Sequence, residues 1–256
     1  MGAPPKAARG LAAETPRRRI LARCVGALTF TLACYAVMTA LVLWAELRQA
    51  PTLPDLMVSA LPYVKWIDRV NYLAWLVAVV PLLAALFALE PERWTRCMVA
   101  LGLLCLARGA CIALTGFGPP NPLNAGPGLA GTDFLSAYLR LLSPAGLFFG
   151  DAPHVLLSKD MFFSGHTSTS FLVLLYLWHR PRLRWAALLA HVAMVAAVAL
   201  AHRHYAIDIV AAYAFAFALF AVREWQPRAP VQRAAVARHE GPIGPVPEPS
   251  SGRSGA

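Results

Sequence analysis

The stretch DMFFSGHTSTSFLVLLYLW (residues 160–178) joins a polar beginning to an apolar run. Its first part carries an acid, a glycine, a histidine and several hydroxyl side chains, whereas FLVLLYLW is apolar. Burying polar groups in hydrocarbon is costly unless they are hydrogen-bonded, so this junction needs an explanation. Two interpretations are open: a helix that begins with polar residues by chance, or a reactive site at the edge of a membrane.

Apolar runs of this kind recur along the chain. The 256 residues are 58% hydrophobic and only 14% charged, far from the composition of ordinary soluble domains. Crossing about 30 Å of hydrocarbon takes roughly 20 helical residues. Runs of suitable length lie near residues 20–45, 70–90, 96–117, 163–179, 183–202 and 205–225. The sequence therefore predicts an all-α integral membrane protein with a bundle of six transmembrane helices.

The basic residues cluster between alternate apolar runs. The net charge is +10, from 23 Lys and Arg against 13 Asp and Glu. By the positive-inside rule the clusters are cytoplasmic, so both the N and C termini are predicted to be cytoplasmic and loops 46–69, 118–162 and 202–204 to face outward. This distribution argues against a nucleic acid partner, and the Arg/Ala/Pro-rich composition suggests a bacterial plasma (inner) membrane. The clustered arginines are Arg17, Arg18, Arg19, Arg23, Arg93, Arg96, Arg180, Arg182, Arg184, Arg223, Arg228, Arg233 and Arg238.

The two ends of the chain differ from its apolar centre. Residues 1–16 are a short lead of Ala, Pro, Lys and Arg, and residues 226–256 are a basic tail rich in Pro, Gly and Ser. Both are predicted to be disordered. Residues 17–225 then form one six-helix membrane domain. Within its long outward loop, FLSAYLRLL (134–142) has the apolar spacing of a short surface helix.

Four polar residues fall at a similar depth on the outer side of the predicted bundle. His166 begins the fourth helix, Arg108 lies in the outward half of the third, and His204 and Asp208 lie at the start of the sixth. His204 and Asp208 are four residues apart, so on a helix they would share one face. An aspartate can hold one imidazole nitrogen as a donor and leave the lone pair of the other nitrogen free to attack an electrophile.

A phosphate site is the second expectation at this edge. Ser164, Gly165 and Thr167 flank His166 at a helix N-terminus, where backbone N–H groups and the helix dipole favour an anion such as phosphate. An intramembrane arginine is costly unless paired, and the planar guanidinium of Arg108 matches phosphate oxygens.

Simpler interpretations remain open for each of these residues. His166 could be a polar cap without chemistry, and Arg108 could snorkel outward or bond a neighbouring helix. Asp208 could merely pair with Arg203 or His202. No metal is expected, although a zinc site is conceivable because its ligand types are present. That site would use His166, His202, His204 and Asp208.

Two of these motifs resemble a known family. FSGHT at 163–167, followed by HYAIDIVAAY at 204–213, is similar to the type 2 phosphatidic acid phosphatase superfamily of lipid phosphatases and phosphotransferases. PTLPD at 51–55 and the arginine in LCLARGACIALTGFGPP resemble its sphingomyelin synthase branch. The resemblance extends over roughly residues 50–225.

Departures from the superfamily pattern also bear on which branch of the superfamily the sequence resembles. Phe163 replaces a proline, and Ala197-Val198 stands where the wider superfamily has a Ser-Arg pair, which both favour the synthase-like branch. Thr52 departs from the Pro-Pro-Leu-Pro-Asp signature of that branch.

The resemblance implies roles for individual residues. His204 would be the nucleophile that attacks the lipid phosphorus, Asp208 would orient it, and His166 would act first as general acid and then as general base. Asp160 would either tune His166 or contact a cationic headgroup, unless it forms a salt bridge with its neighbour Lys159. Asp55, in the PTLPD motif, would contribute to substrate binding.

The resemblance therefore implies a lipid phosphotransferase of sphingolipid metabolism. It would move a phosphocholine-type or phosphoethanolamine-type headgroup from a glycerophospholipid to a lipid alcohol such as ceramide or diacylglycerol. No cofactor is expected. With water as acceptor the protein would be a lipid phosphate phosphatase, and an inactive membrane scaffold is the remaining alternative. The site is expected on the periplasmic (exoplasmic) side.

Overall fold

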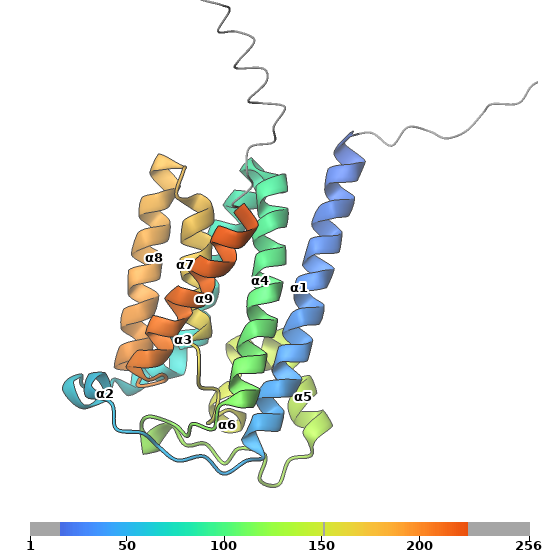
Figure 1. Ribbon diagram of the computed structural model, residues 1–256. Helices are drawn as coiled ribbons and strands as arrows, with labels where there is room; N and C mark the ends of the chain where they lie inside the picture. Colours follow the sequence, from blue (N-terminus) through green and yellow to red (C-terminus); the bar gives the residue numbers. More distant parts are fainter. Residues whose placement is uncertain (1–15, 151, 225–256) are drawn as a thin grey trace, which may run out of the picture.

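The computed structural model describes residues 16–150 and 152–224, and every regular element among them is helical (Figure 1). The predicted disordered tails, residues 1–16 and 226–256, lie outside the described residues, except that the first helix already begins at Pro16. In chain order the elements are α1 (Pro16–Glu46), α2 (Leu56–Ala60), α3 (Lys65–Leu89), α4 (Pro91–Leu114), η1 (Pro122–Asn124), α5 (Phe134–Leu142), η2 (Ala145–Phe149), α6 (Ala152–Leu156), α7 (Gly165–Leu177), α8 (Pro181–Leu200) and α9 (Ala206–Glu224).

Five helices of the described chain are long and apolar enough to cross a membrane: α1, α3, α4, α8 and α9. They overlap five of the six predicted spans, so a multi-pass membrane protein is supported. The remaining predicted span, 163–179, contains α7, which has only 13 residues. At 1.5 Å per residue α7 extends over about 20 Å, less than the hydrocarbon thickness. The count of six spans is therefore not confirmed.

The short helix α7 lies in the interior of the bundle. It packs against α3, α4, α8 and α9 (Figure 1). Its residues Leu172, Val173, Tyr176 and Leu177 are completely buried. A helix that is apolar on all sides is typical of a core position, where protein covers every face.

The basic residues and the long loops lie at opposite ends of the bundle. The start of α1, the α3–α4 turn, the α7–α8 turn and the end of α9 share one end of the bundle in Figure 1. In the sequence, Arg17, Arg93, Arg180 and Arg223 lie at or next to these positions. The opposite end carries α2, α5 and α6 with their connecting loops. This arrangement agrees with the alternation expected from the sequence, while the direction of the bundle in its membrane remains a prediction.

The short surface helix expected from FLSAYLRLL is confirmed as α5. Asp133 caps it, because the side-chain carboxylate accepts hydrogen bonds from the backbone N–H groups of Leu135 and Ser136. α5 packs against α1 at the loop end of the bundle. It thus helps to cover that end.

Close packing of α1 on α4 depends on glycine in α4. A Cβ atom added at Gly109 would lie 3.1 Å from Met38 Cα and 3.1 Å from Leu41 Cδ1 in α1. We expect Gly109→Val to lower the free energy of unfolding by about 1–3 kcal/mol, because the larger side chain overpacks this contact. Thermal or denaturant unfolding of the purified protein in detergent measures the change.

A matched control is Gly26→Val in α1, since a Cβ at Gly26 meets no atom within 4 Å. Both variants place a β-branched residue in a helix, so their difference isolates the contact with α1. Equal losses of stability would contradict the proposed role of Gly109.

Candidate active site

His204 and Asp208 form a buried pair at the loop end of α9. His204 Nδ1 lies 3.1 Å from Asp208 Oδ2, which also accepts a hydrogen bond of 3.1 Å from the backbone N–H of Tyr205. His204 precedes α9, so the pair is formed across the helix start and not along one helical face as expected. The aspartate accepts from Nδ1–H, which leaves the lone pair on Nε2. Of the two interpretations of Asp208, the structure gives the pair with His204 and not one with Arg203 or His202.

His166 occupies the first turn of α7, and Ser164 caps that helix. The Ser164 hydroxyl accepts from the backbone N–H of Thr167 at 3.4 Å, and the backbone N–H of Ser164 donates to the carbonyl of Asp208 at 3.1 Å. This second bond fixes the start of α7 against the start of α9, and so positions His166 relative to His204. The Nε2 atom of His166 is buried without a hydrogen-bond partner in the described residues. Its ring meets the Tyr72 ring edge-on at 4.9 Å between centroids.

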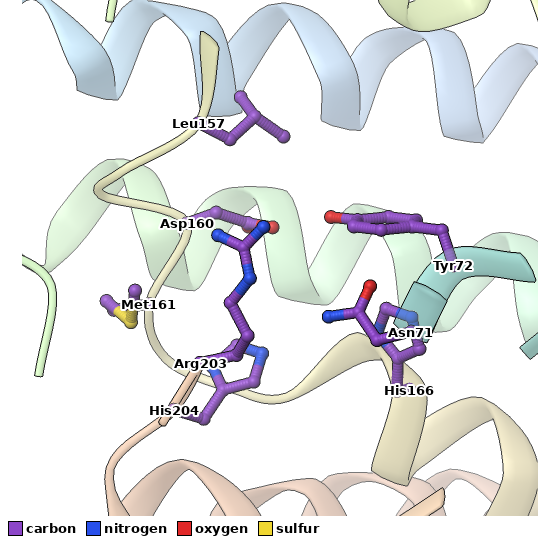
Figure 2. Close-up of a pocket in the computed structure, with 8 residues that line it drawn as sticks. All are labelled: Asn71, Tyr72, Leu157, Asp160, Met161, His166, Arg203 and His204. Atoms are coloured by element: carbon purple, nitrogen blue, oxygen red, sulfur yellow. The ribbon is translucent and has the colours of Figure 1, made fainter. Parts of the chain in front are cut away.

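His166 and His204 line one small cavity (Figure 2). Its volume is about 20 Å³, which is room for about one water molecule. A phosphoryl group is larger, so the lining side chains must move apart to admit one. The complete lining consists of Asn71, Tyr72, Leu157, Asp160, Met161, His166, Arg203 and His204.

Arg108 lies beside this cavity and does not line it. Its Nε donates to the carbonyl of Phe163 at 2.7 Å, and its Nη2 donates to Asp160 Oδ1 at 2.6 Å. A Cβ atom at Gly165 would lie 3.1 Å from Arg108 Nε, so the glycine leaves the space that the guanidinium fills. The structure thus gives Arg108 a packing and pairing role at the entry to α7. Phosphate contact by Arg108 remains a prediction that this geometry does not favour.

Asp160 lines the cavity, and its salt-bridge partner is Arg108 and not Lys159. Lys159 is held elsewhere: its Nζ donates to the carbonyl of Glu46 at 2.7 Å, and the Glu46 carboxylate accepts from the Lys159 backbone N–H at 2.6 Å. Glu46 also accepts two bonds of 2.8 Å from Ser158. The last turn of α1 therefore fixes the loop that presents Asp160.

Asp55 does not line the cavity, although the resemblance assigned it to substrate binding. Its Oδ1 accepts from Val58 N–H at 3.0 Å and caps α2, and its Oδ2 accepts from Ala206 N–H at 2.8 Å at the start of α9. Nearby, Tyr205 Oη accepts from the backbone N–H of Leu53 at 3.0 Å. The PTLPD segment thus braces the chain on either side of His204. Thr167 also lies outside the lining, with its hydroxyl buried and unpaired within the described residues.

Three polar lining residues were not predicted from the sequence as site residues: Asn71, Tyr72 and Arg203. Asn71 and Tyr72 lie in the second turn of α3, where their polar atoms could have been noticed as interruptions of an apolar run. Arg203 was considered only as a partner for Asp208. Its position next to His204 was the available signal.

The zinc alternative receives no support from the geometry. His202 Nδ1 pairs with Asn121 at 3.2 Å, and its Nε2 lies 3.1 Å from the carbonyl of Leu61. Both ring nitrogens are thus engaged away from His204. Over residues 16–150 and 152–224, no three potential ligand side chains gather as a metal site would require.

Part of the chain matches a protein-family model. No curated protein matches the chain. Residues 159–225, which contain α7, α8 and α9 with His166, His204 and Asp208, match a family model described as PAP2 superfamily C-terminal. This match supports placing the chain in the type 2 phosphatidic acid phosphatase superfamily of lipid phosphatases and phosphotransferases.

Proposed function

We propose that the protein is a membrane lipid phosphotransferase of the sphingomyelin synthase type. It would transfer a phosphocholine-type or phosphoethanolamine-type headgroup from a glycerophospholipid to a lipid alcohol such as ceramide or diacylglycerol. The observation that carries the proposal is that His204, oriented by Asp208, and the unpaired Nε2 of His166 belong to the lining of one cavity.

In the first step, the Nε2 lone pair of His204 attacks phosphorus while the bond from phosphorus to the diacylglycerol oxygen breaks. His166 donates a proton to that oxygen, so diacylglycerol leaves as a neutral alcohol. The headgroup remains on His204 as a phosphohistidine. Asp208 holds the Nδ1 proton and stabilises the positive charge that develops on the ring.

In the second step, His166 removes the proton from the incoming hydroxyl group, whose oxygen attacks phosphorus. The N–P bond breaks, and its electron pair returns to His204. Both histidines are thereby restored. With water in place of the lipid alcohol, the same two steps release a phosphorylated headgroup or phosphate, which would make the protein a phosphatase.

The test supplies purified protein with labelled phosphatidylcholine, phosphatidylethanolamine or phosphatidic acid, with and without ceramide. New headgroup-bearing lipid that forms only with ceramide supports transfer. Phosphate released from phosphatidic acid supports the phosphatase instead. If neither product forms with any donor, the inactive scaffold is the better description.

The proposal places the site on the periplasmic or exoplasmic side of a bacterial inner membrane. In a cysteine-free background, Ser136→Cys on exposed α5 should react with a membrane-impermeant thiol reagent in intact cells or spheroplasts. Arg182→Cys, exposed at the opposite end of the bundle, should react only after lysis. The reverse pattern would overturn the predicted orientation.

A further inference from the structure

A second arginine lies beside the proposed nucleophile. Arg203 directly precedes His204, and its side chain belongs to the lining of the same cavity, with 12% of that side chain exposed. We propose that Arg203 is the residue that binds the phosphoryl group of the substrate. This inference rests on the proposed function and names the anion-binding group of that same site.

The guanidinium of Arg203 is held in place, but its contacts do not use all of its N–H donors. Its Nε lies 2.5 Å from Asp68 Oδ1 on α3, and its Nη2 contacts His154 Nδ1 on α6. Within the described residues, Nη1 makes no hydrogen bond. A guanidinium carries five N–H donors in a planar fork, so donors on Nη1 remain available for phosphoryl oxygens.

More of the donors of Arg108 are engaged. Phe163, Asp160 and the sulfur of Met38 surround its nitrogens, with Nη1 3.8 Å from Met38 Sδ. Arg108 also lies outside the cavity lining, to which Arg203 belongs. Arg203 can bind an anion while its ion pair with Asp68 persists, which makes it the better-placed cation.

Groups across the cavity complete an anion site. Figure 2 shows Arg203 and His204 on one side and His166, Asn71 and Tyr72 on the other, with the Tyr72 hydroxyl directed toward the space between them. The His166 Nε2 atom is buried and has no partner in the described part of the chain. A phosphoryl group held by Arg203 would lie between the proposed nucleophile and the proposed acid.

The test measures binding apart from turnover. Inorganic phosphate, and separately short-chain phosphatidic acid in the same detergent, are titrated into the purified protein by calorimetry. We expect Arg203→Ala to weaken binding by about tenfold to a hundredfold, as for loss of hydrogen bonds to a charged group. Arg203→Lys should fall between wild type and Arg203→Ala, because lysine keeps the charge and loses the fork. Arg182→Ala, an exposed arginine at the opposite end, is the control and should bind as wild type.

Asp68→Asn separates anion binding from a structural role. If Arg203 binds the anion, this variant should bind phosphate as tightly as wild type or more tightly, because a competing carboxylate is gone. If Arg203 only links α3 to α6, Asp68→Asn should weaken binding as much as Arg203→Ala does, which would overturn the proposal. Size-exclusion profiles confirm that each variant remains folded.

The two binding arms also identify the source of the anion. A loss in both arms shows recognition of the phosphoryl group itself, and a loss confined to phosphatidic acid shows recognition of a lipid headgroup; either result supports the proposal. Equal affinities of wild type and Arg203→Ala in both arms would overturn it. Wild-type binding through Arg203 without transfer or hydrolysis would instead reject the proposed function and leave this inference intact.

Discussion

His204→Asn is expected to reduce headgroup transfer by about 10⁴-fold or more, to the background of the assay. The asparagine amide can still donate to Asp208, so the buried carboxylate keeps a partner. The amide lacks the basic nitrogen with which the imidazole would attack phosphorus. Loss of a covalent nucleophile removes both displacements at once. Initial rates with the donor and acceptor pair found active for wild type provide the measurement, and mass spectrometry of a rapidly quenched wild-type reaction should find the headgroup on the peptide that contains His204.

His179→Asn is the matched control for that variant. His179 lies at the opposite end of the bundle, where Nε2 is 2.7 Å from Glu90, and Arg180 continues to pair with Glu90 after the change. It should keep turnover near the wild-type rate. Transfer by His204→Asn within tenfold of wild type, or an adduct on another residue, would show that the nucleophile has been misassigned.

The apolar pattern allowed most of the fold to be predicted, because composition and run length depend only on local sequence. The start of α7 was also readable, since Ser164 is a good N-cap and the apolar run begins soon after it. The length of α7 could not be predicted from the sequence in the same way. An apolar run of this kind fits a membrane span or a buried core helix equally well, and only packing against four neighbouring helices distinguishes them.

The site was predictable where its residues are close in sequence. His204 and Asp208 are four residues apart, and their contact was expected from that spacing, although it forms across the start of α9 and not along one helical face. Arg108 and Asp160 are 52 residues apart, and no local pattern indicates that they pair. An arginine in a membrane span must be neutralised, but the sequence does not say by which acid. From the sequence alone, the partner of Arg108 could have been either phosphate or Asp160.

Asp55 shows that a family resemblance, like a local sequence pattern, does not reveal which groups a residue contacts. A motif identifies which residues recur together but not what they touch. In this structure the Asp55 carboxylate accepts hydrogen bonds from backbone N–H groups of α2 and α9. Such a residue can act on a reaction by fixing the backbone around His204 without contacting substrate. Arg203 is the converse case, because no motif marked it and the fold brings Asp68 and His154 to it from α3 and α6.

His166→Asn should lower the rate of transfer from a natural phospholipid by about 10²–10⁴-fold, the usual contribution of a general acid or base. If His166 acts as the general acid, the effect of this substitution on the rate should depend on the leaving group. Diacylglycerol leaves as a poor alkoxide and needs a proton, whereas nitrophenolate leaves readily without one. With nitrophenyl phosphocholine, His166→Asn should therefore release about one nitrophenol per chain at nearly the wild-type rate and then turn over slowly, because the second step still lacks its base.

The burst distinguishes an acid–base role for His166 from a structural one. If His166 merely fills space against Tyr72, where the ring centroids are 4.9 Å apart, then replacing it should slow both donors alike by disturbing the lining. His204→Asn should show no burst with either donor, because its defect precedes the release of any leaving group. Equal impairment of His166→Asn with the phospholipid and nitrophenyl donors would show that His166 does not transfer the proton. That result would hold even though, in the described chain, His166 Nε2 is buried and unpaired and its ring lines the same cavity as the proposed nucleophile.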